Sequence, residues 1–270
     1  KELIVIENGG KFGADEIVLK YEESLHARYM YSEPGNKSIA LNHALEQIDD
    51  DYIVFFDDDI LVTEHILMEY ERASEKYGKK HYFGGPSFPD YEKKPDKKLM
   101  QYLPHSAKLY TYGNKERRIR NALFMGYNWA AYSDDIKQAG GFNPNFGPGE
   151  NTLATGQEKT MQKDLDKIGC RAIFLPKASV YHIIPEDECS LEWALKRYYK
   201  SGIYRGIEIM KRKRLSKKLS LLNWHIIYPV WLRIKSFFSR DREHHYEYLL
   251  MKSHLKGLFS GLLIDKEKTE

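Results

Sequence analysis

Short apolar runs alternate with helical patterns through the first half of the chain. The run at 3–6 and the run YIVFF at 52–56 are compact and predict buried strands, and a further strand is expected at 27–31. Between them, apolar residues recur at helical spacing from 37 to 48. This alternation is typical of βαβ units. It predicts an α/β fold with a mostly parallel sheet flanked by helices.

The second half of the chain continues the strand and helix pattern and then becomes helical. Residues 84–120 are rich in Gly, Pro, Lys and Tyr and read as a long irregular connection. Beyond Ser190 we expect about three helical segments. Between these two parts, strands are expected near 127–132, 171–175 and 178–182, and a helix at about 157–168.

These patterns divide the chain of 270 residues into a domain at 1–190 and a helical C-terminal extension at 191–270. The chain begins at Lys1 and enters a strand at once, so we expect that a preceding segment, with the usual first strand of such a domain, is missing. The longest uncharged run, 219–232, is too short for a spanning helix, which needs roughly 17–25 apolar residues.

Composition narrows the classes of protein further. Hydrophobic residues make up 42% of the chain and charged residues 30%, which is ordinary for a protein with an apolar core. The formal net charge of +3 gives no argument for a nucleic-acid partner. The only cysteines, Cys170 and Cys189, provide neither a disulfide framework nor metal-ligand spacing. They suit a reducing compartment, and we expect a cytoplasmic location.

Three consecutive acids, Asp57, Asp58 and Asp59, follow the strand at 52–56. Ligands of open α/β sheets gather at the carboxyl ends of strands. Adjacent carboxylates repel one another unless a cation lies between them, and hard ions such as Mg²⁺ or Mn²⁺ prefer oxygen ligands. A metal site that holds a diphosphate is one interpretation. A solvated acidic turn before the next helix is the other.

Two later residues also allow two interpretations each. Glu158 follows Thr155 at capping-box spacing, so it either closes the first turn of a helix or serves as a general base at the mouth of the sheet. His182 follows an apolar strand. It is either a hydrogen-bonded structural residue or a neutral imidazole that completes a metal site begun by carboxylates.

Read in order, these segments resemble the family 2 glycosyltransferases, which are inverting enzymes of the GT-A fold. The resemblance covers about residues 1–205, and the order and spacing of its parts make it specific. The matching segments are VIENGG at 5–10, GNKSIALNHAL at 35–45, YIVFFDDDI at 52–60, GYNWAAYS at 126–133, GGFNPNFGPG at 140–149, GQEKTMQKDL at 156–165 and YHIIP at 181–185.

The resemblance implies a role for each matching residue. Strand-end aspartates of the family bind the divalent metal, which implies Asp57 and Asp59, with His182 as a further ligand. The catalytic base would be Glu158. The resemblance also implies residues that bind the donor. Glu7 and Asn8 would contact the nucleoside, and the others are Lys37, Asn42, Asp57 and Asp58.

The chain departs from the family pattern at several positions. Leu41 stands where an arginine is common before Asn42, Glu7 replaces an aspartate, and Gln157 stands where an acid is common. With the missing first strand, these departures leave a degenerate carbohydrate- or nucleotide-binding domain as an alternative. A second alternative is a sugar-nucleotide nucleotidyltransferase, but the Gly-rich basic phosphate loop of that class is not visible in the sequence.

The resemblance implies a hexosyltransferase that uses a nucleotide sugar, expected to be a UDP-sugar, together with Mn²⁺ or Mg²⁺. The acceptor would be a hydroxyl group of a glycan or lipid-linked molecule, in polysaccharide or cell-envelope synthesis. No nucleic-acid partner is expected.

The helical tail carries six basic side chains among residues 211–218 and an apolar run directly after them. This order suits a helix that lies on an anionic membrane surface. We therefore consider peripheral membrane contact through 211–238, at the inner face of the membrane. A helix packed on the domain with a solvated charge run is the alternative.

Overall fold

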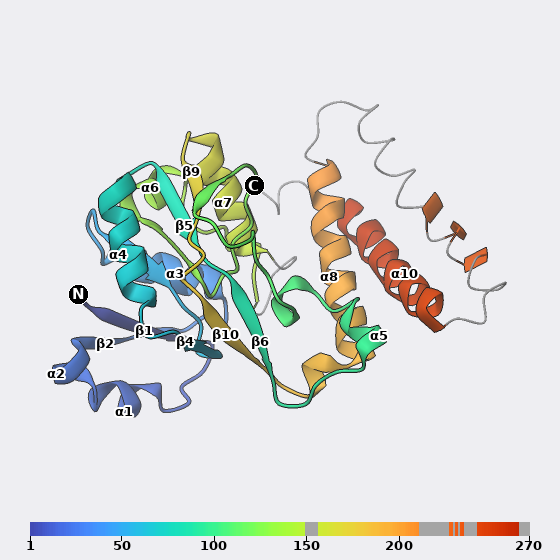
Figure 1. Ribbon diagram of the computed structural model, residues 1–270, viewed down its shortest axis with the longest axis horizontal. Coiled ribbons are helices and arrows are strands. Elements are labelled where there is room, and N and C mark those ends of the chain that lie inside the picture. Colours follow the sequence, from blue (N-terminus) through green and yellow to red (C-terminus); the bar gives the residue numbers. More distant parts are fainter. Residues whose placement is uncertain (149–155, 211–226, 229, 232, 235–241, 265–270) are drawn as a thin grey trace. The chain divides into compact units, whose positions relative to one another are not determined.

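The computed structural model describes residues 1–148, 156–210, 227–228, 230–231, 233–234 and 242–264 (Figure 1). The chain forms two compact units, and neither is continuous in sequence. The first unit comprises Lys1–Pro86 and Thr111–Val180, and the second comprises Ser87–Tyr110 and Tyr181–Glu270. The boundary near residue 190, between a catalytic domain and an extension, stays a prediction.

Apart from the short strand β4 (Ile60–Val62), the strands of the first unit form a two-stranded sheet and a five-stranded sheet. In the smaller sheet, β1 (Leu3–Asn8) runs parallel to β2 (Ala27–Ser32). The larger sheet has the order β3-β8-β5-β9-β7. Its strands are β3 (Tyr52–Phe55), β5 (His81–Gly84), β7 (Arg117–Ile119), β8 (Trp129–Tyr132) and β9 (Arg171–Phe174).

The larger sheet is mixed, and the expectation of a mostly parallel sheet is wrong in this respect. Strand β8 lies between β3 and β5 and is antiparallel to both, and β7 is antiparallel to β9. Only β5 and β9 are parallel in this sheet. A short apolar run that is buried on both faces looks the same in either orientation, so hydrophobicity alone could not reveal the direction.

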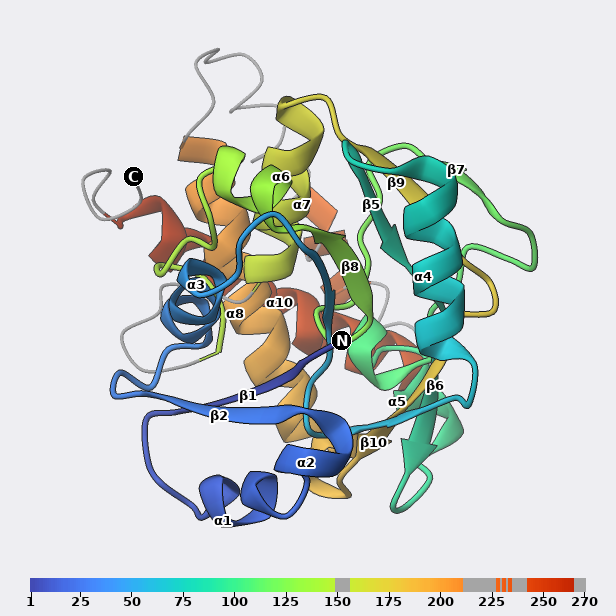
Figure 2. The same cartoon turned by 90° about the vertical axis from the view of Figure 1, so that its left-hand side faces the viewer.

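Helices cover the strands of the first unit (Figure 2). Helix α3 packs on β1 and β2, α4 on β5, α6 on β8 and α7 on β9. This confirms the α/β class with a sheet flanked by helices. The bounds are α1 (Ala14–Leu19), α2 (Glu22–Leu25), α3 (Lys37–Glu46), α4 (Ile66–Tyr77), α6 (Ser133–Gln138) and α7 (Gln157–Lys167), and a short strand β4 (Ile60–Val62) precedes α4.

The core of the first unit is aromatic, and one buried amide joins its segments. Trp129 is almost fully buried and stacks on Phe55, with the ring centroids 4.6 Å apart. The neighbouring Asn128 donates to the carbonyl oxygens of Pro86 and Ala178 and accepts from the hydroxyl of Tyr70. All of the amide's bonds are internal, so Asn128 holds three segments together around β8.

The second unit contains the helical C-terminal part. Two of its strands, β6 (Ser87–Tyr91) and β10 (Val180–Ile184), are hydrogen-bonded neighbours. The long helices α8 (Leu191–Met210) and α10 (Arg242–Leu262) pack side by side. The shorter elements are α5 (Lys97–Met100) and the 3₁₀ turns η1 (His105–Ala107) and η2 (Asp187–Cys189).

Regular structure within 84–120 corrects the expectation of a long irregular connection there. Strand β6, helix α5, turn η1 and strand β7 all lie in this stretch. Leu99 and Leu103 from it are buried in a core with Ile184 and Leu250. These elements have only three to five residues and are not continuous apolar runs, so the sequence pattern missed them. No helix among the described residues is long and apolar enough to cross a membrane.

Candidate active site

The three acids lie in the turn that follows β3. Asp57 is half-buried, whereas Asp58 and Asp59 are exposed in the turn that leads into β4. Strand β3 is the edge strand of the larger sheet and is hydrogen-bonded along its length to β8, so its end presents these carboxylates at a defined place on the sheet edge.

A lysine ammonium pairs with the first of these acids. Lys37 is the first residue of α3, and its Nζ bonds to Oδ1 of Asp57. Asn36 fixes the start of the helix, because its side-chain oxygen accepts from the backbone N–H groups of Ser38 and Ile39, at 3.0 and 3.2 Å. Its amide nitrogen donates to Pro144 O at 2.8 Å. The cap therefore places Lys37 opposite the end of β3.

The start of α3 is also joined to the start of α7. The buried hydroxyl of Ser38 lies 2.7 Å from Phe146 O and 3.2 Å from Oε1 of Gln157. Gln157 is the first residue of α7 and is 2% exposed. A charged side chain would be costly at this buried position, which explains the neutral amide where the family pattern commonly has an acid.

Glu158 is the second residue of α7, and its side chain lies along Gly126. A Cβ atom built at Gly126 would be 3.6 Å from the Cβ, Cγ and Cδ atoms of Glu158. The helix begins after Gly156, which has φ of 105° and contributes no side-chain cap. Glu158 is therefore not in the third helical position that a capping box requires, so the capping interpretation is not supported. Thr155 lies outside the described residues.

The bonds of Lys37 and Ser38 therefore bring the acidic turn and the start of α7 to the N-terminal end of α3. Lys37 binds Asp57, and the adjacent Ser38 binds Gln157, the neighbour of Glu158. The metal-binding and base candidates of the first unit are thus held at the N-terminus of α3 by consecutive residues. Sequence reasoning did not assign Ser38 or Gln157 a role, since a single Ser or Gln in a helical pattern carries no signal of a buried contact.

The side chain of Asn42 is hydrogen-bonded to the backbone of Phe142. Its Nδ2 donates to Phe142 O, and its Oδ1 accepts from Phe142 N, both at 2.8 Å. The nitrogen and the oxygen of the Asn42 amide are thus both hydrogen-bonded to the backbone of the segment that follows α6. The geometry gives Asn42 a positioning function, and its contact with a donor stays a prediction.

Glu7 and Asn8 end β1 in the first unit. The carboxylate of Glu7 accepts from Phe12 N and from the hydroxyl of Tyr29, both at 2.7 Å. The hydrogen bond from Tyr29 to this anion raises the pKa of Tyr29 to about 12. The strand end is therefore ordered by Glu7, and the contact of both residues with a nucleoside stays a prediction.

His182 belongs to β10 in the second unit and is 6% exposed. Its Nδ1 lies 2.8 Å from the carbonyl oxygen of Ser106, which can only accept, so the proton resides on Nδ1. This tautomer makes Nε2 the acceptor atom. Metal-binding histidines are commonly oriented in the same way, by a carbonyl on the other nitrogen. The role of His182 as a metal ligand stays a prediction.

The donor set in the turn fits a hard divalent cation. Asp57 and Asp59 offer carboxylate oxygens, and the ammonium of Lys37 already stands as a cation against Asp57. Among the described residues, no group of three or more His, Cys, Asp and Glu side chains is arranged to hold a metal by itself. A cation here would therefore complete its shell with water and ligand oxygens, as Mg²⁺ commonly does.

Several solved structures of glycosyltransferases have the same fold. A mannosyltransferase of Pyrobaculum calidifontis, in complex with GDP-Man and Mn²⁺, matches 97% of this chain and 78% of its own, with a TM-score of 0.60 and 15% identity. S. aureus TarS 1–349, in complex with UDP-GlcNAc, matches 96% of this chain and 82% of its own, with a TM-score of 0.53 and 12% identity. These similarities identify the GT-A class of fold.

A third similar structure is GalNAc-T7 with UDP, GalNAc and Mn²⁺, which matches 75% of this chain and 41% of its own, with a TM-score of 0.50 and 11% identity. No curated protein sequence matches the chain. The family described as "Glycosyl transferase family 2" matches residues 1–139, more than half of the chain. The chain therefore belongs to glycosyl transferase family 2 and is a glycosyltransferase.

Proposed function

We propose that this protein transfers a sugar from a nucleotide-sugar donor to a hydroxyl group with inversion at the anomeric carbon. The family membership supports sugar transfer, and the arrangement of Lys37, Asp57 and Glu158 supports the chemistry. The observation that carries the proposal is that one helix end, at Lys37 and Ser38, is bonded to both the acidic turn and the start of α7.

The donor diphosphate would bind near the acidic turn. Asp57 and Asp59 would hold Mn²⁺ or Mg²⁺, with His182 as the predicted further ligand. When bound, such an ion offsets negative charge on the departing nucleoside diphosphate. Lys37 contributes a positive charge to the same place and is suited to a phosphate oxygen once its partner Asp57 binds the cation. Glu7 and Asn8 would contact the nucleoside, and UDP is the expected nucleotide.

Glu158 would act as the general base. Its carboxylate would accept the proton of the acceptor hydroxyl as the hydroxyl oxygen forms its bond to the anomeric carbon and the bond to the diphosphate oxygen breaks. A single displacement of this kind inverts the anomeric centre. A Cβ atom added at Gly126 would be in ordinary van der Waals contact with the Glu158 side chain, so that side chain lies beside residue 126.

The acceptor is a hydroxyl of a glycan or a lipid-linked molecule, and the protein would act in the cytoplasm. Contact with the inner face of the membrane would involve 211–238. Most of this segment, including the basic run 211–218, lies outside the described residues. Within it, Ile227, Val230, Trp231 and Ile234 are described and are exposed, at the spacing of one helix face.

The substitution Glu158→Gln tests the proposal. With a panel of UDP- and GDP-sugars, Mn²⁺ and candidate acceptors, the wild-type protein should release nucleoside diphosphate and form a glycoside. General-base catalysis is worth about 10²–10⁴-fold, so the variant should lose that much in kcat. Its affinity for the nucleoside diphosphate, measured by calorimetry, should change little.

The exposed Glu64→Gln is the matched control, since it removes a carboxylate that lies elsewhere in the first unit. It should retain full turnover. Full turnover in Glu158→Gln would remove Glu158 from the mechanism. Release of pyrophosphate in place of nucleoside diphosphate would indicate nucleotidyl transfer, and nucleotide binding without turnover of any donor would indicate a binding domain.

A further inference from the structure

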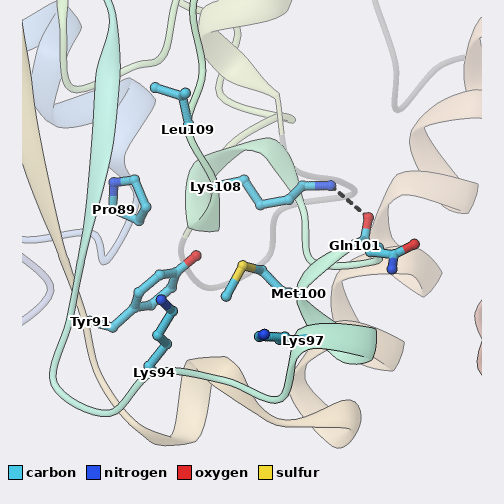
Figure 3. A pocket seen from close by; sticks show the side chains of 8 residues that line it. All are labelled: Pro89, Tyr91, Lys94, Lys97, Met100, Gln101, Lys108 and Leu109. Carbon is cyan, nitrogen blue, oxygen red and sulfur yellow. Dashed lines mark hydrogen bonds between the residues drawn. The ribbon is translucent and has the colours of Figure 1, made fainter.

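An open pocket of about 710 Å³ lies within the second unit. One of its walls is β6, and the other lining residues come from the segment 94–101 and from the two residues after η1 (Figure 3). The alternation of side chains along β6 explains which of its residues line the pocket. Side chains alternate along a strand, so Pro89 and Tyr91 face the pocket together, while Phe88 on the other face packs against Tyr181.

Hydrogen bonds fix two sides of the pocket. The hydroxyl of Tyr91 donates to Ala107 O at 2.7 Å, which ties β6 to η1. The ammonium of Lys108 donates to the backbone carbonyl oxygen of Gln101 at 2.9 Å and spans the pocket in this view (Figure 3). The first bond joins residues 16 apart and the second joins residues seven apart, so both connect different lining segments and help to define the shape of the pocket.

The pocket is strongly cationic. Lys94, Lys97 and Lys108 line it, and none of its eight lining residues is acidic. Within the described part of the chain, no ion pair holds Lys94 or Lys97. Burial lowers the pKa of Lys108, which shows that its positive charge is incompletely solvated. An anion in the pocket would offset all three charges.

The acids of the same segment are engaged elsewhere. The carboxylate of Asp96 accepts from the backbone N–H groups of Lys98 and Leu99 at the start of α5. Glu92 accepts from the backbone N–H of Glu186, and Glu186 in turn pairs with Lys93. The segment therefore keeps its carboxylates outside the pocket and its lysines inside it.

Three lysines from two segments of the chain suit a compact anion with several equivalent oxygens. Phosphate is such a group, because its oxygens can accept from ammonium groups on different sides. Pro89, Met100 and Leu109 add an apolar wall, so the group attached to the phosphate can itself be partly apolar.

We propose that this pocket binds the phosphoryl group of a phosphate-bearing glycan or lipid. The further identification of this molecule as the sugar acceptor rests on the proposed function. The binding itself does not, because the pocket and its charges belong to the second unit alone.

Calorimetry of the full chain without any sugar donor tests the binding. The probes are dodecyl phosphate below its micelle concentration, inorganic phosphate, and dodecyl maltoside as a neutral molecule with the same alkyl chain. We expect saturable binding of dodecyl phosphate. The double variant Lys94→Gln/Lys97→Gln should weaken it at least tenfold, since two charge-assisted hydrogen bonds to the phosphoryl oxygens are lost.

The matched control is Lys93→Gln/Lys98→Gln, which removes two charges from the same exposed segment without altering the pocket lining. It should bind dodecyl phosphate as the wild type does. Competition by inorganic phosphate would indicate that the phosphoryl group suffices, as in a phosphorylated glycan. Binding of dodecyl phosphate without such competition would indicate a lipid phosphate. Equal binding of dodecyl maltoside, or equal losses in both double variants, would overturn the proposal.

Turnover then separates this inference from the proposed function. Lys94→Gln/Lys97→Gln should raise KM for a phosphate-bearing acceptor and leave kcat and donor affinity unchanged. If Glu158→Gln abolishes transfer but the lysine variant changes neither binding nor KM, the pocket proposal fails alone. If dodecyl phosphate binds through the lysines but no donor is turned over, the proposed function fails alone.

Discussion

The ammonium group of Lys37 is paired with the carboxylate of Asp57, which joins the first residue of α3 to the residue that follows Phe56 at the end of the β3 strand. Both side chains are about one quarter exposed. The protein therefore neutralises part of its acidic turn with its own cation. A divalent ion that binds Asp57 must compete with this lysine, whereas a diphosphate would be attracted by it.

The substitution Lys37→Met should move two affinities in opposite directions. Without the competing ammonium, affinity for Mn²⁺ should rise, and without its positive charge, affinity for UDP in the presence of Mn²⁺ should fall. An interaction of roughly 1 kcal/mol for a partly exposed pair corresponds to about fivefold in each. Calorimetry with each ligand measures both values.

Lys37→Arg is the control for this prediction, because it retains the positive charge at the start of α3. It should bind both ligands nearly as the wild type does. If Lys37→Met left both affinities unchanged, Asp57 would have no part in binding either ligand.

Loss of the Asn42 amide should weaken the fold more than it alters donor binding. Asn42→Ala leaves the N–H and the carbonyl of Phe142 without their partner, and each unsatisfied group costs about 1–3 kcal/mol when it is shielded from water. Urea unfolding should show a loss of about 2–4 kcal/mol. Asn114→Ala, at an exposed position, should change stability little. A stable Asn42→Ala protein with weakened UDP binding would instead support the donor role.

Sequence patterns predicted β3, β8 and β9 of the first unit from compact apolar runs, and its longer helices from their period. The helix expected at 37–48 is α3 (Lys37–Glu46), and that expected at 157–168 is α7 (Gln157–Lys167). Strand direction was not predictable, since β8 has the same apolar composition in either orientation.

The sequence indicated candidate site residues, whose roles stay predictions, but not their arrangement. The motifs indicated Asp57 and Glu158, yet the bonds that relate them, from Lys37 to Asp57 and from Ser38 to Gln157, depend on the fold, and the second joins residues 119 apart. The pocket of the second unit was not foreseen either. Lys94, Lys97 and Lys108 have no regular spacing, and only the fold brings them to one cavity.

Glu116 should make stability depend on acid pH. Burial alone would raise its pKa, but hydrogen bonds from Lys76, Tyr77 and Arg72 on α4 outweigh this and lower the pKa from 4.5 to about 2. A carboxyl group with a depressed pKa stabilises the fold above its unfolded pKa. The contribution is therefore full above about pH 4.5 and is lost as the pH falls towards 2.

The size of this effect is limited by solvent. A shift of this size corresponds to about 3 kcal/mol, but Arg72 and Lys76 are about half exposed, so we expect about 1–2 kcal/mol. Chemical unfolding between pH 5 and pH 2 measures it. Glu116→Gln should remove this part of the pH dependence, whereas the more exposed Glu71→Gln should retain it. Parallel pH profiles for the wild type and Glu116→Gln would contradict the prediction.

Glycines set the closest approach of α8 and α10. A Cβ at Gly257 on α10 would lie 1.9 Å from the carbonyl oxygen of Tyr199 on α8, and one at Gly261 would lie 2.2 Å from that of Ile203. Gly202 on α8 faces α10 in the same way, 2.1 Å from His254 O. These contacts are with backbone atoms, so a methyl group at any of these positions must push the helices apart.

Gly257→Ala should therefore destabilise the second unit, although alanine is the better helix former by about 1 kcal/mol. Overpacking of this kind typically costs 1–3 kcal/mol, and separation of two helix backbones should reach the upper part of that range. The loss of buried contact along α8 should appear as a lower midpoint in thermal unfolding followed by circular dichroism. Lys256→Ala, one residue earlier and exposed, places an alanine on α10 outside the contact and should leave the midpoint unchanged or slightly higher. An unchanged midpoint in Gly257→Ala would show that α8 and α10 are not held at this close distance in solution.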